Sequence, residues 1–164
     1  MNLQIKKITK DNFSLYGDLI SIQDKDSEDI NNSTTQSFFD LTNIEILGVN
    51  LKARLNIFKA KRRIFPLNID MLEMHPFSSQ VFLPITKTNF LVLVSPIANK
   101  PDLQKLECFI VSNEDGINFK PKVWHFPLIS IEDAKFITID KKDAGKNLEI
   151  YKFTENEKFI LNYE

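Results

Sequence analysis

Apolar residues recur at every second position in several segments of the chain. The clearest series have apolar side chains at positions 51, 53, 55 and 57, and again at 81, 83 and 85. Further short apolar runs occupy residues 3–8, 90–94, 106–111, 128–131, 136–139 and 148–153. A period of two is typical of strands, in which successive side chains point to opposite faces. The pattern therefore predicts short strands along most of the chain.

Helix signals are few and short. One segment offers Thr9 as an N-cap and Gly17 as a stop, and a second has Pro101 near a first helical position. Many short strands with one or two brief helices predict an all-β fold, a barrel or double-sheet sandwich of the jelly-roll kind. The polar segment 23–37, "QDKDSEDINNSTTQS", is predicted to be a mobile loop over one mouth of that barrel.

Length and composition limit the classes of function. The 164 residues fit a single domain, 1–164, with one core. Twenty-one basic and 22 acidic residues give a net charge of −1, so composition gives no reason to expect nucleic acid or a membrane as partner. The single cysteine, Cys108, excludes a disulfide within the chain, and neither a signal peptide nor a long apolar run is visible. We expect a cytoplasmic protein with a small-molecule partner.

The two histidines are the main candidates for chemistry. In "EMHPFSSQVFLP", strand alternation points Glu73 and His75 to the same side, and Gln80 follows the break at Pro76. The other imidazole, His125, lies 50 residues away in "NFKPKVWHFPL", so a shared site requires the fold to bring the two together. The chain has no HxH, HExxH or CxxC motif. Spacing alone leaves open whether His75 is a ligand, an acid or base, or a hydrogen-bonded structural residue.

Several segments, in order along nearly the whole chain, carry a family resemblance. They are "FSLYGDLI" at 13–20, "INN" at 30–32, "DL" at 40–41, "LEMHPFSSQVFLPI" at 72–85, "KPDLQKLECFIVSNEDGINF" at 100–119, "VWHFPL" at 123–128 and "FITID" at 136–140. Through these segments the chain resembles the ureidoglycolate lyase family, formerly called ureidoglycolate hydrolases, of the cupin superfamily.

The resemblance implies a fold, an activity and a set of site residues. The fold would be a cupin-like double-stranded β-helix, or jelly-roll barrel, usually a homodimer. The activity would be release of urea and glyoxylate from ureidoglycolate during allantoin breakdown in purine catabolism, with a divalent metal, nickel by family resemblance. The matching pocket positions are Glu73, His75, Gln80, Asn118, Trp124 and His125.

These residues suit an elimination from a carbon that carries both a hydroxyl group and the urea nitrogen. A base, for which imidazole has a suitable pKa, removes the hydroxyl proton, and an acid or a metal helps urea to leave. We therefore assign His75, His125 and Glu73 as catalytic, and Lys59, Gln80, Asn118 and Trp124 as substrate-binding. A metal would be held by His75 and His125 with an oxygen from Glu73 or Gln80, and Lys59 would pair with the substrate carboxylate.

The chain departs from the family pattern at polar positions. Ser37 and Lys59 stand where relatives usually have arginine, and Lys120 and Phe126 stand where they often have histidine. Lysine keeps the charge of arginine but loses its two-pronged recognition of a carboxylate. A non-catalytic cupin that binds a small carboxylate or ureido acid is therefore the alternative, and ligand stabilisation without turnover would distinguish it.

Overall fold

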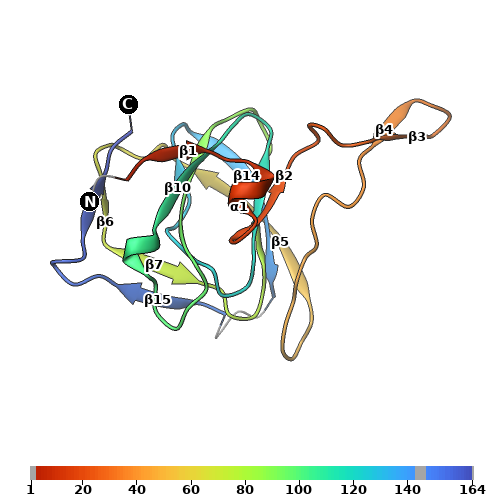
Figure 1. Cartoon of the computed structure of the whole chain (residues 1–164). Coiled ribbons are helices and arrows are strands. Elements are labelled where there is room, and N and C mark those ends of the chain that lie inside the picture. Colours follow the sequence, from red (N-terminus) through yellow and green to blue (C-terminus); the bar gives the residue numbers. More distant parts are fainter. Residues whose placement is uncertain (1–2, 143–146, 164) are drawn as a thin grey trace.

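Two β-sheets make up most of the computed structural model, which describes residues 3–142 and 147–163. The seven-stranded sheet contains, in spatial order, β1 (Ile5–Lys7), β10 (Glu107–Val111), β9 (Phe90–Ser95), β12 (Trp124–His125), β7 (Met71–Met74) and β15 (Glu149–Lys152), with β13 (Ile129–Ser130) also paired to β9. The five-stranded sheet has the order β2 (Gly17–Ile20), β11 (Gly116–Phe119), β8 (Gln80–Pro84), β14 (Ala134–Lys141) and β5 (Ala53–Ala60). These sheets curve around a common interior (Figure 1), which confirms the predicted all-β, cupin-like architecture.

One core cluster lies between the two sheets. It combines side chains of β9 and β10, such as Phe90 and Phe109, with side chains of β8, β11 and β14, such as Phe82, Phe119 and Phe136. Aromatic rings meet across it: the Phe90 and Phe136 ring centroids are 5.2 Å apart in an edge-to-face arrangement. The abundance of phenylalanine in the sequence is thus explained by this interior.

A second cluster covers the opposite face of the seven-stranded sheet. Strand β9 contributes to both clusters because its residues alternate, with Phe90 and Val92 in the first and Leu91 and Leu93 in the second. The cover comes from a two-stranded sheet of β6 (Leu67–Ile69) and β16 (Phe159–Leu161) and from the chain around β15. Such burial on both faces makes β9 the central strand of the molecule.

Both predicted helices are present and short. Helix α1 (Lys10–Phe13) is capped by Thr9, whose hydroxyl accepts from the Asn12 N–H while the Asn12 side chain accepts from the Thr9 N–H. The second is the 3₁₀ turn η1 (Leu103–Lys105), capped by Asp102. None of the helices in the described part of the chain has the length and hydropathy needed to cross a bilayer.

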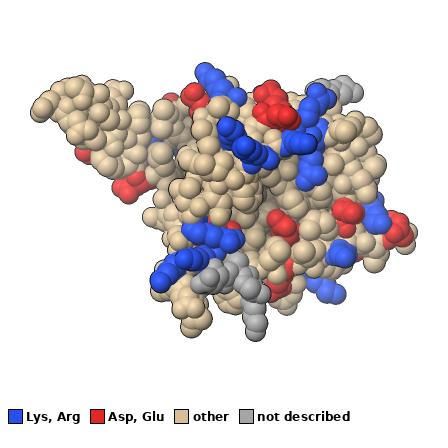
Figure 2. Space-filling view, turned by 180° about the vertical axis from the view of Figure 1, so that it is seen from behind, with Lys and Arg blue, Asp and Glu red and all other residues tan. Residues whose placement is uncertain are grey.

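The prediction that segment 23–37 is a loop over one mouth of the barrel is wrong. This segment contains a hairpin of β3 (Glu28–Ile30) and β4 (Thr35–Ser37), which projects from the body instead of covering it (Figure 1). Three residues with positive φ, Asn31, Asn32 and Ser33, form the turn that reverses the chain. Figure 2 shows that the projecting tip carries no charged side chain, whereas basic and acidic groups are interspersed over the body.

Candidate functional site

Two neighbouring strands bring the sequence-distant acid and histidine together. Strands β12 and β7 are antiparallel, and His125 is the direct cross-strand partner of Glu73. Their side chains approach to 3.7 Å between His125 Nε2 and Glu73 Oε1. His75 follows β7 on the same side as Glu73, and the His75 and His125 ring centroids are 5.4 Å apart. The 50-residue separation of the two imidazoles is thus closed by strand pairing.

The tautomer of each imidazole is set by a backbone carbonyl. His75 Nδ1 lies 2.6 Å from the Asn147 carbonyl oxygen, and His125 Nδ1 lies 3.0 Å from that of Val123. A carbonyl only accepts, so Nδ1 of each ring carries the hydrogen and donates it. The lone pair of each neutral ring is therefore on Nε2, and neither Nε2 has a hydrogen-bond partner among the described residues.

Burial keeps both rings neutral. Desolvation lowers the pKa of His125 to about 3, and the neighbouring His75 contributes in the same direction. Desolvation also lowers the pKa of His75, although the Asn147 carbonyl, Asp140 and Gln80 oppose the shift. The pKa of Glu73 is raised, again because its carboxyl is buried. The groups facing one another are thus two unprotonated nitrogens and an acid that holds its proton more readily than usual.

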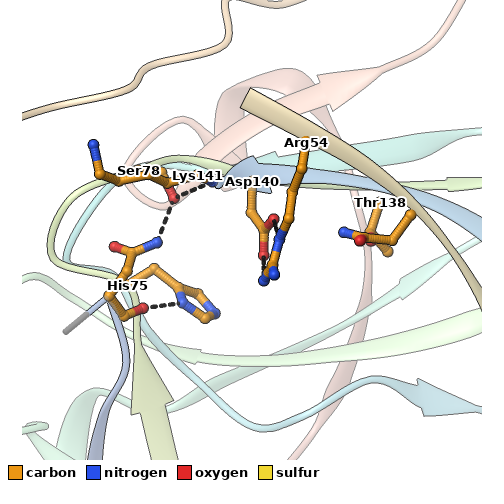
Figure 3. A network of polar contacts seen from close by, with 8 residues as sticks. Arg54, His75, Ser78, Thr138, Asp140 and Lys141 are labelled. Atoms are coloured by element: carbon orange, nitrogen blue, oxygen red, sulfur yellow. Dashed lines mark hydrogen bonds and ion pairs between the residues drawn. The ribbon is translucent and has the colours of Figure 1, made fainter. Parts of the chain in front are cut away.

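A network of asparagine and serine holds His75 in place. The Asn147 side chain, whose residue is only 2% exposed, accepts from the Phe77 N–H at 2.8 Å and donates to Ser78 Oγ at 2.8 Å. Ser78 Oγ also accepts from the Lys141 N–H on β14. Figure 3 shows His75, Ser78 and Lys141 in this network. The carbonyl that orients the imidazole is thereby tied to both sheets.

The cluster opens into a pocket of about 810 Å³ that is lined by residues of both sheets. Glu73, His75 and Gln80 lie on its wall, while His125 is buried behind them and stacked on Phe119 with ring centroids 4.3 Å apart. The pocket is otherwise notable for charge, since it contains five basic residues against Glu73 and Asp140. The basic residues are Arg54, Lys59, Lys61, Arg62 and Arg63. Such an excess of positive charge favours an anionic ligand.

All three arginines of the chain line this pocket, a feature the sequence analysis missed. Arg54 forms a two-pronged pair with Asp140, with Nε to Oδ1 at 2.7 Å and Nη2 to Oδ2 at 3.1 Å. Figure 3 shows this pair beside His75. The two residues lie directly opposite one another on the paired strands β5 and β14. The signal in the sequence was a charged residue within the first of these two predicted strands and another directly after the second. Reading that signal required knowing which strands pair.

Of the predicted substrate-binding residues, Gln80 and Lys59 line the pocket in different ways. Gln80 is buried, and its Oε1 has no hydrogen-bond partner among the described residues. Lys59 lies on the edge strand β5 opposite Lys135, on the face of the strand that also carries Leu55 and Ile57. Alternation places that face away from the one that carries Arg54. Lys59 therefore contributes to the rim.

Asn118 and Trp124 lie outside the pocket. The Asn118 amide donates to Thr42 Oγ1 and to the Asn43 carbonyl, both at 2.8 Å, on the side of β11 away from the core. Trp124 alternates with His125, packs in the second cluster and donates from Nε1 to the Ala98 carbonyl at 2.9 Å. Their substrate-binding roles stay a prediction, and the contacts that the structure gives them are structural ones.

The four positions that depart from the family pattern lie in four different regions. Ser37 ends the projecting hairpin, and Lys120 donates to the Ser14 carbonyl beside a separate surface pocket. Phe126 belongs to the second core cluster, and the Arg63 guanidinium lies over its ring at 5.9 Å from the centroid. Of the four altered positions, only Lys59 itself lines the pocket of the histidines.

The ligand atoms of Glu73, His75 and His125 fit a divalent metal ion of borderline hardness, such as nickel or zinc. One ligand atom each from Glu73, His75 and His125 lies within 4.8 Å of the other two. Two imidazole nitrogens and a carboxylate are ligands that nickel and zinc accept, and both imidazoles show the carbonyl-bound Nδ1 that commonly orients metal-ligating histidines. Gln80 lines the same pocket, and its Oε1, which has no hydrogen-bond partner in the described part of the chain, offers a further oxygen. These residues form a candidate metal site.

Comparisons with known proteins agree along the whole chain. Residues 1–160 match the family model described as "Ureidoglycolate lyase". Over 161 residues this chain is 34% identical to the protein named ureidoglycolate lyase from Pseudomonas syringae pv. tomato, and 35% identical to the one from Pseudomonas putida strain F1. These alignments cover 98% of this chain and 95% and 96% of the relatives. The chain belongs to the ureidoglycolate lyase family.

Proposed function

We propose that this protein cleaves ureidoglycolate to glyoxylate and urea. The observation that carries the proposal is the convergence of the Glu73 carboxyl with the Nε2 atoms of His75 and His125, both of which hold lone pairs and lack partners among the described residues. Full-length similarity to proteins named ureidoglycolate lyase supports the choice of substrate. The positive charge of the pocket agrees with a substrate that carries a carboxylate.

The reaction asks for one proton to be taken and one to be given. The proton of the substrate hydroxyl passes to Nε2 of His75, and the O–H electron pair forms the carbonyl of glyoxylate. The carbon–nitrogen bond breaks, its electron pair leaves with the urea nitrogen, and that nitrogen takes a proton from the Glu73 carboxyl. No net water or redox partner is consumed. His125, fixed by Phe119 and by the Val123 carbonyl, orients Glu73 across the strand pair.

The same residues would hold a divalent metal, which we propose to be nickel by family resemblance. Glu73, His75 and His125 would be its ligands, with Gln80 beside them. When bound, the metal would act as a Lewis acid that lowers the pKa of the substrate hydroxyl. With the metal bound, the Nε2 atoms of His75 and His125 and the Glu73 carboxylate would serve as its ligands, and these residues would then act by fixing the metal beside the substrate hydroxyl.

The test is glyoxylate release from ureidoglycolate by the purified protein, with and without added nickel, against the spontaneous rate. We expect release above that rate in at least one condition. Failure in both would overturn the proposal. If ureidoglycolate nevertheless raised the thermal stability of the protein, the non-catalytic binding alternative would be favoured instead.

Homodimerisation, a single domain over 1–164 and a cytoplasmic location stay predictions. The first is supported by the edge strand β5, where Leu55 and Ile57 are 62% and 59% exposed on the outer face. Exposed apolar edges of this kind are commonly covered by another chain. Size-exclusion chromatography with light scattering measures the mass directly, and a mass of one chain would contradict the dimer.

A further inference from the structure

We propose that Arg63, seated on the ring of Phe126, recognises the carboxylate of the substrate and so sets the specificity of the pocket. This inference rests on the proposed function, because it takes the ligand to be an α-hydroxy carboxylate with its hydroxyl end at the histidine cluster. It replaces Lys59 in that role.

The backbone of Arg63 is anchored to the opposite sheet. Its N–H donates to the Ser130 carbonyl at 2.7 Å, and the N–H of the preceding Arg62 donates to Asp133 Oδ1 at 2.8 Å. These two bonds fix the segment that follows β5 against the end of β13 and the loop after it. Arg63 therefore starts from a defined point on the pocket wall, although its side chain is exposed.

The guanidinium of Arg63 lies over the Phe126 ring and forms no ion pair among the described residues. Its Cζ lies 5.9 Å from the Phe126 centroid, within the range of a cation–π contact. A guanidinium that lies over a ring uses its flat face, whereas its N–H donors point outward in the plane. No carboxylate pairs with Arg63 in the part of the chain that the structure describes. Its fork is therefore available to take both oxygens of a ligand carboxylate.

The other cations of the pocket are less suited to this task. Arg54 is bound through two nitrogens to Asp140, which offsets its charge. Lys59 stands on the outward side of β5, and a lysine lacks the fork that fits a carboxylate. Arg62 lines the same pocket, but the structure records no aromatic ring beneath it among the described residues. Among the described residues of the pocket, Arg63 is the one that combines an anchored backbone, an aromatic ring beneath it and a guanidinium with no ion-pair partner.

The experiment compares Arg63→Gln with the wild type in two independent assays. One measures kcat and KM for ureidoglycolate. The other measures the Kd of glycolate, a small unreactive α-hydroxy carboxylate, and of glycolamide, its uncharged counterpart. Lys135→Gln, which removes an exposed cation from the outer face of β14, is the matched charge control.

We expect Arg63→Gln to raise KM and the glycolate Kd together by about 10- to 100-fold, because hydrogen bonds between charged groups are among the strong ones. The value of kcat and the glycolamide Kd should stay within a few-fold of the wild type, and Lys135→Gln should change nothing. Phe126→Leu keeps the charge but removes the platform, so it should raise KM by about 2- to 5-fold, the range of an exposed cation–π contact.

The two proposals can fail separately. If Arg63→Gln leaves KM and the preference for glycolate over glycolamide within about twofold of the wild type, the role of Arg63 is wrong even though turnover is normal. If the wild type never releases glyoxylate but binds glycolate in an Arg63-dependent way, the lyase proposal fails and the carboxylate site stands.

Discussion

Replacing Asn147 by alanine tests whether the network behind His75 positions the imidazole. The side chain is buried, and it bridges the Phe77 N–H and Ser78 Oγ at 2.8 Å each. Removing it deletes two hydrogen bonds, each contributing about 1 kcal/mol, and leaves the Phe77 donor without its partner, which costs about 1–2 kcal/mol more. We expect Asn147→Ala to lower the free energy of unfolding by roughly 2–4 kcal/mol, or about 5–15 °C in Tm.

The functional effect should exceed that of a general loss of stability. The Asn147 carbonyl accepts from His75 Nδ1 at 2.6 Å, and the side-chain bridge fixes the backbone that carries this carbonyl. Loss of such an outer partner typically lowers metal affinity or activity by about 10- to 100-fold. Urea unfolding gives the free energy of unfolding, and glyoxylate release gives the activity. Both are measured on one sample, well below Tm.

Two variants provide the controls. Ser78→Ala removes one end of the bridge together with the bond from the Lys141 N–H, so a loss in stability similar to that of Asn147→Ala is expected while the Asn147 bond to the Phe77 N–H remains. Asn99→Ala changes an exposed asparagine and should be neutral. Full activity in Asn147→Ala at the expected loss of stability would refute the positioning role, and a loss below about 1 kcal/mol would refute the energetic reasoning.

Three further predictions concern the fold and the metal. Burial raises the pKa of Glu107, but hydrogen bonds from Lys6 and Tyr16 outweigh it, so the folded pKa lies below the ordinary 4.5. The stabilisation by the Glu107 carboxylate is therefore present at neutral pH and is lost as the pH falls through the pKa of Glu107 in the folded protein. Glu107→Gln should reduce the fall in the free energy of unfolding, measured with urea, on acidification. An unchanged pH profile would contradict this. A Cβ on Gly17 would lie 2.0 Å from the Asn118 carbonyl oxygen, so Gly17→Ala should prevent folding as judged by circular dichroism, whereas Gly48→Ala, at φ +80°, should cost only about 1 kcal/mol. Calorimetric titration should show one nickel ion bound per wild-type chain and none to His125→Ala; equal binding by both would exclude the proposed ligand set.

Much of the fold was predictable because strand signals are local. Alternation located β5 and β8, and short apolar runs located β9, β10 and β14, to within a few residues; Thr9 was correctly identified as a helix cap. The hairpin of β3 and β4 was missed because all but one of its strand residues are polar and most are exposed, which removes the periodic signal. An apolar period also does not say which face is buried, since Leu55 and Ile57 turn out to be exposed.

The site was predictable only in part, for a related reason. Alternation puts Glu73 and His75 on one side of β7, but their approach to His125 depends on the pairing of β7 with β12, a contact across 50 residues. Arg54, Asp140 and Asn147 reach the site through similar long-range contacts. Asn118 and Trp124 match the family motif, yet alternation turns both away from the pocket. Phe126, an altered position, gains a role that only its contact with Arg63 reveals.

The most direct test of the central claim compares glyoxylate release by the wild type and by Glu73→Gln, side by side on ureidoglycolate. Glutamine preserves the shape of a half-buried residue but cannot give or take the proton, and it is a weaker ligand. We predict release above the spontaneous rate by the wild type and a fall in kcat/KM of at least about 100-fold in the variant. Equal rates in the two proteins would contradict it, because the reaction would then take place without the Glu73 carboxyl, one of the three groups of the proposed site.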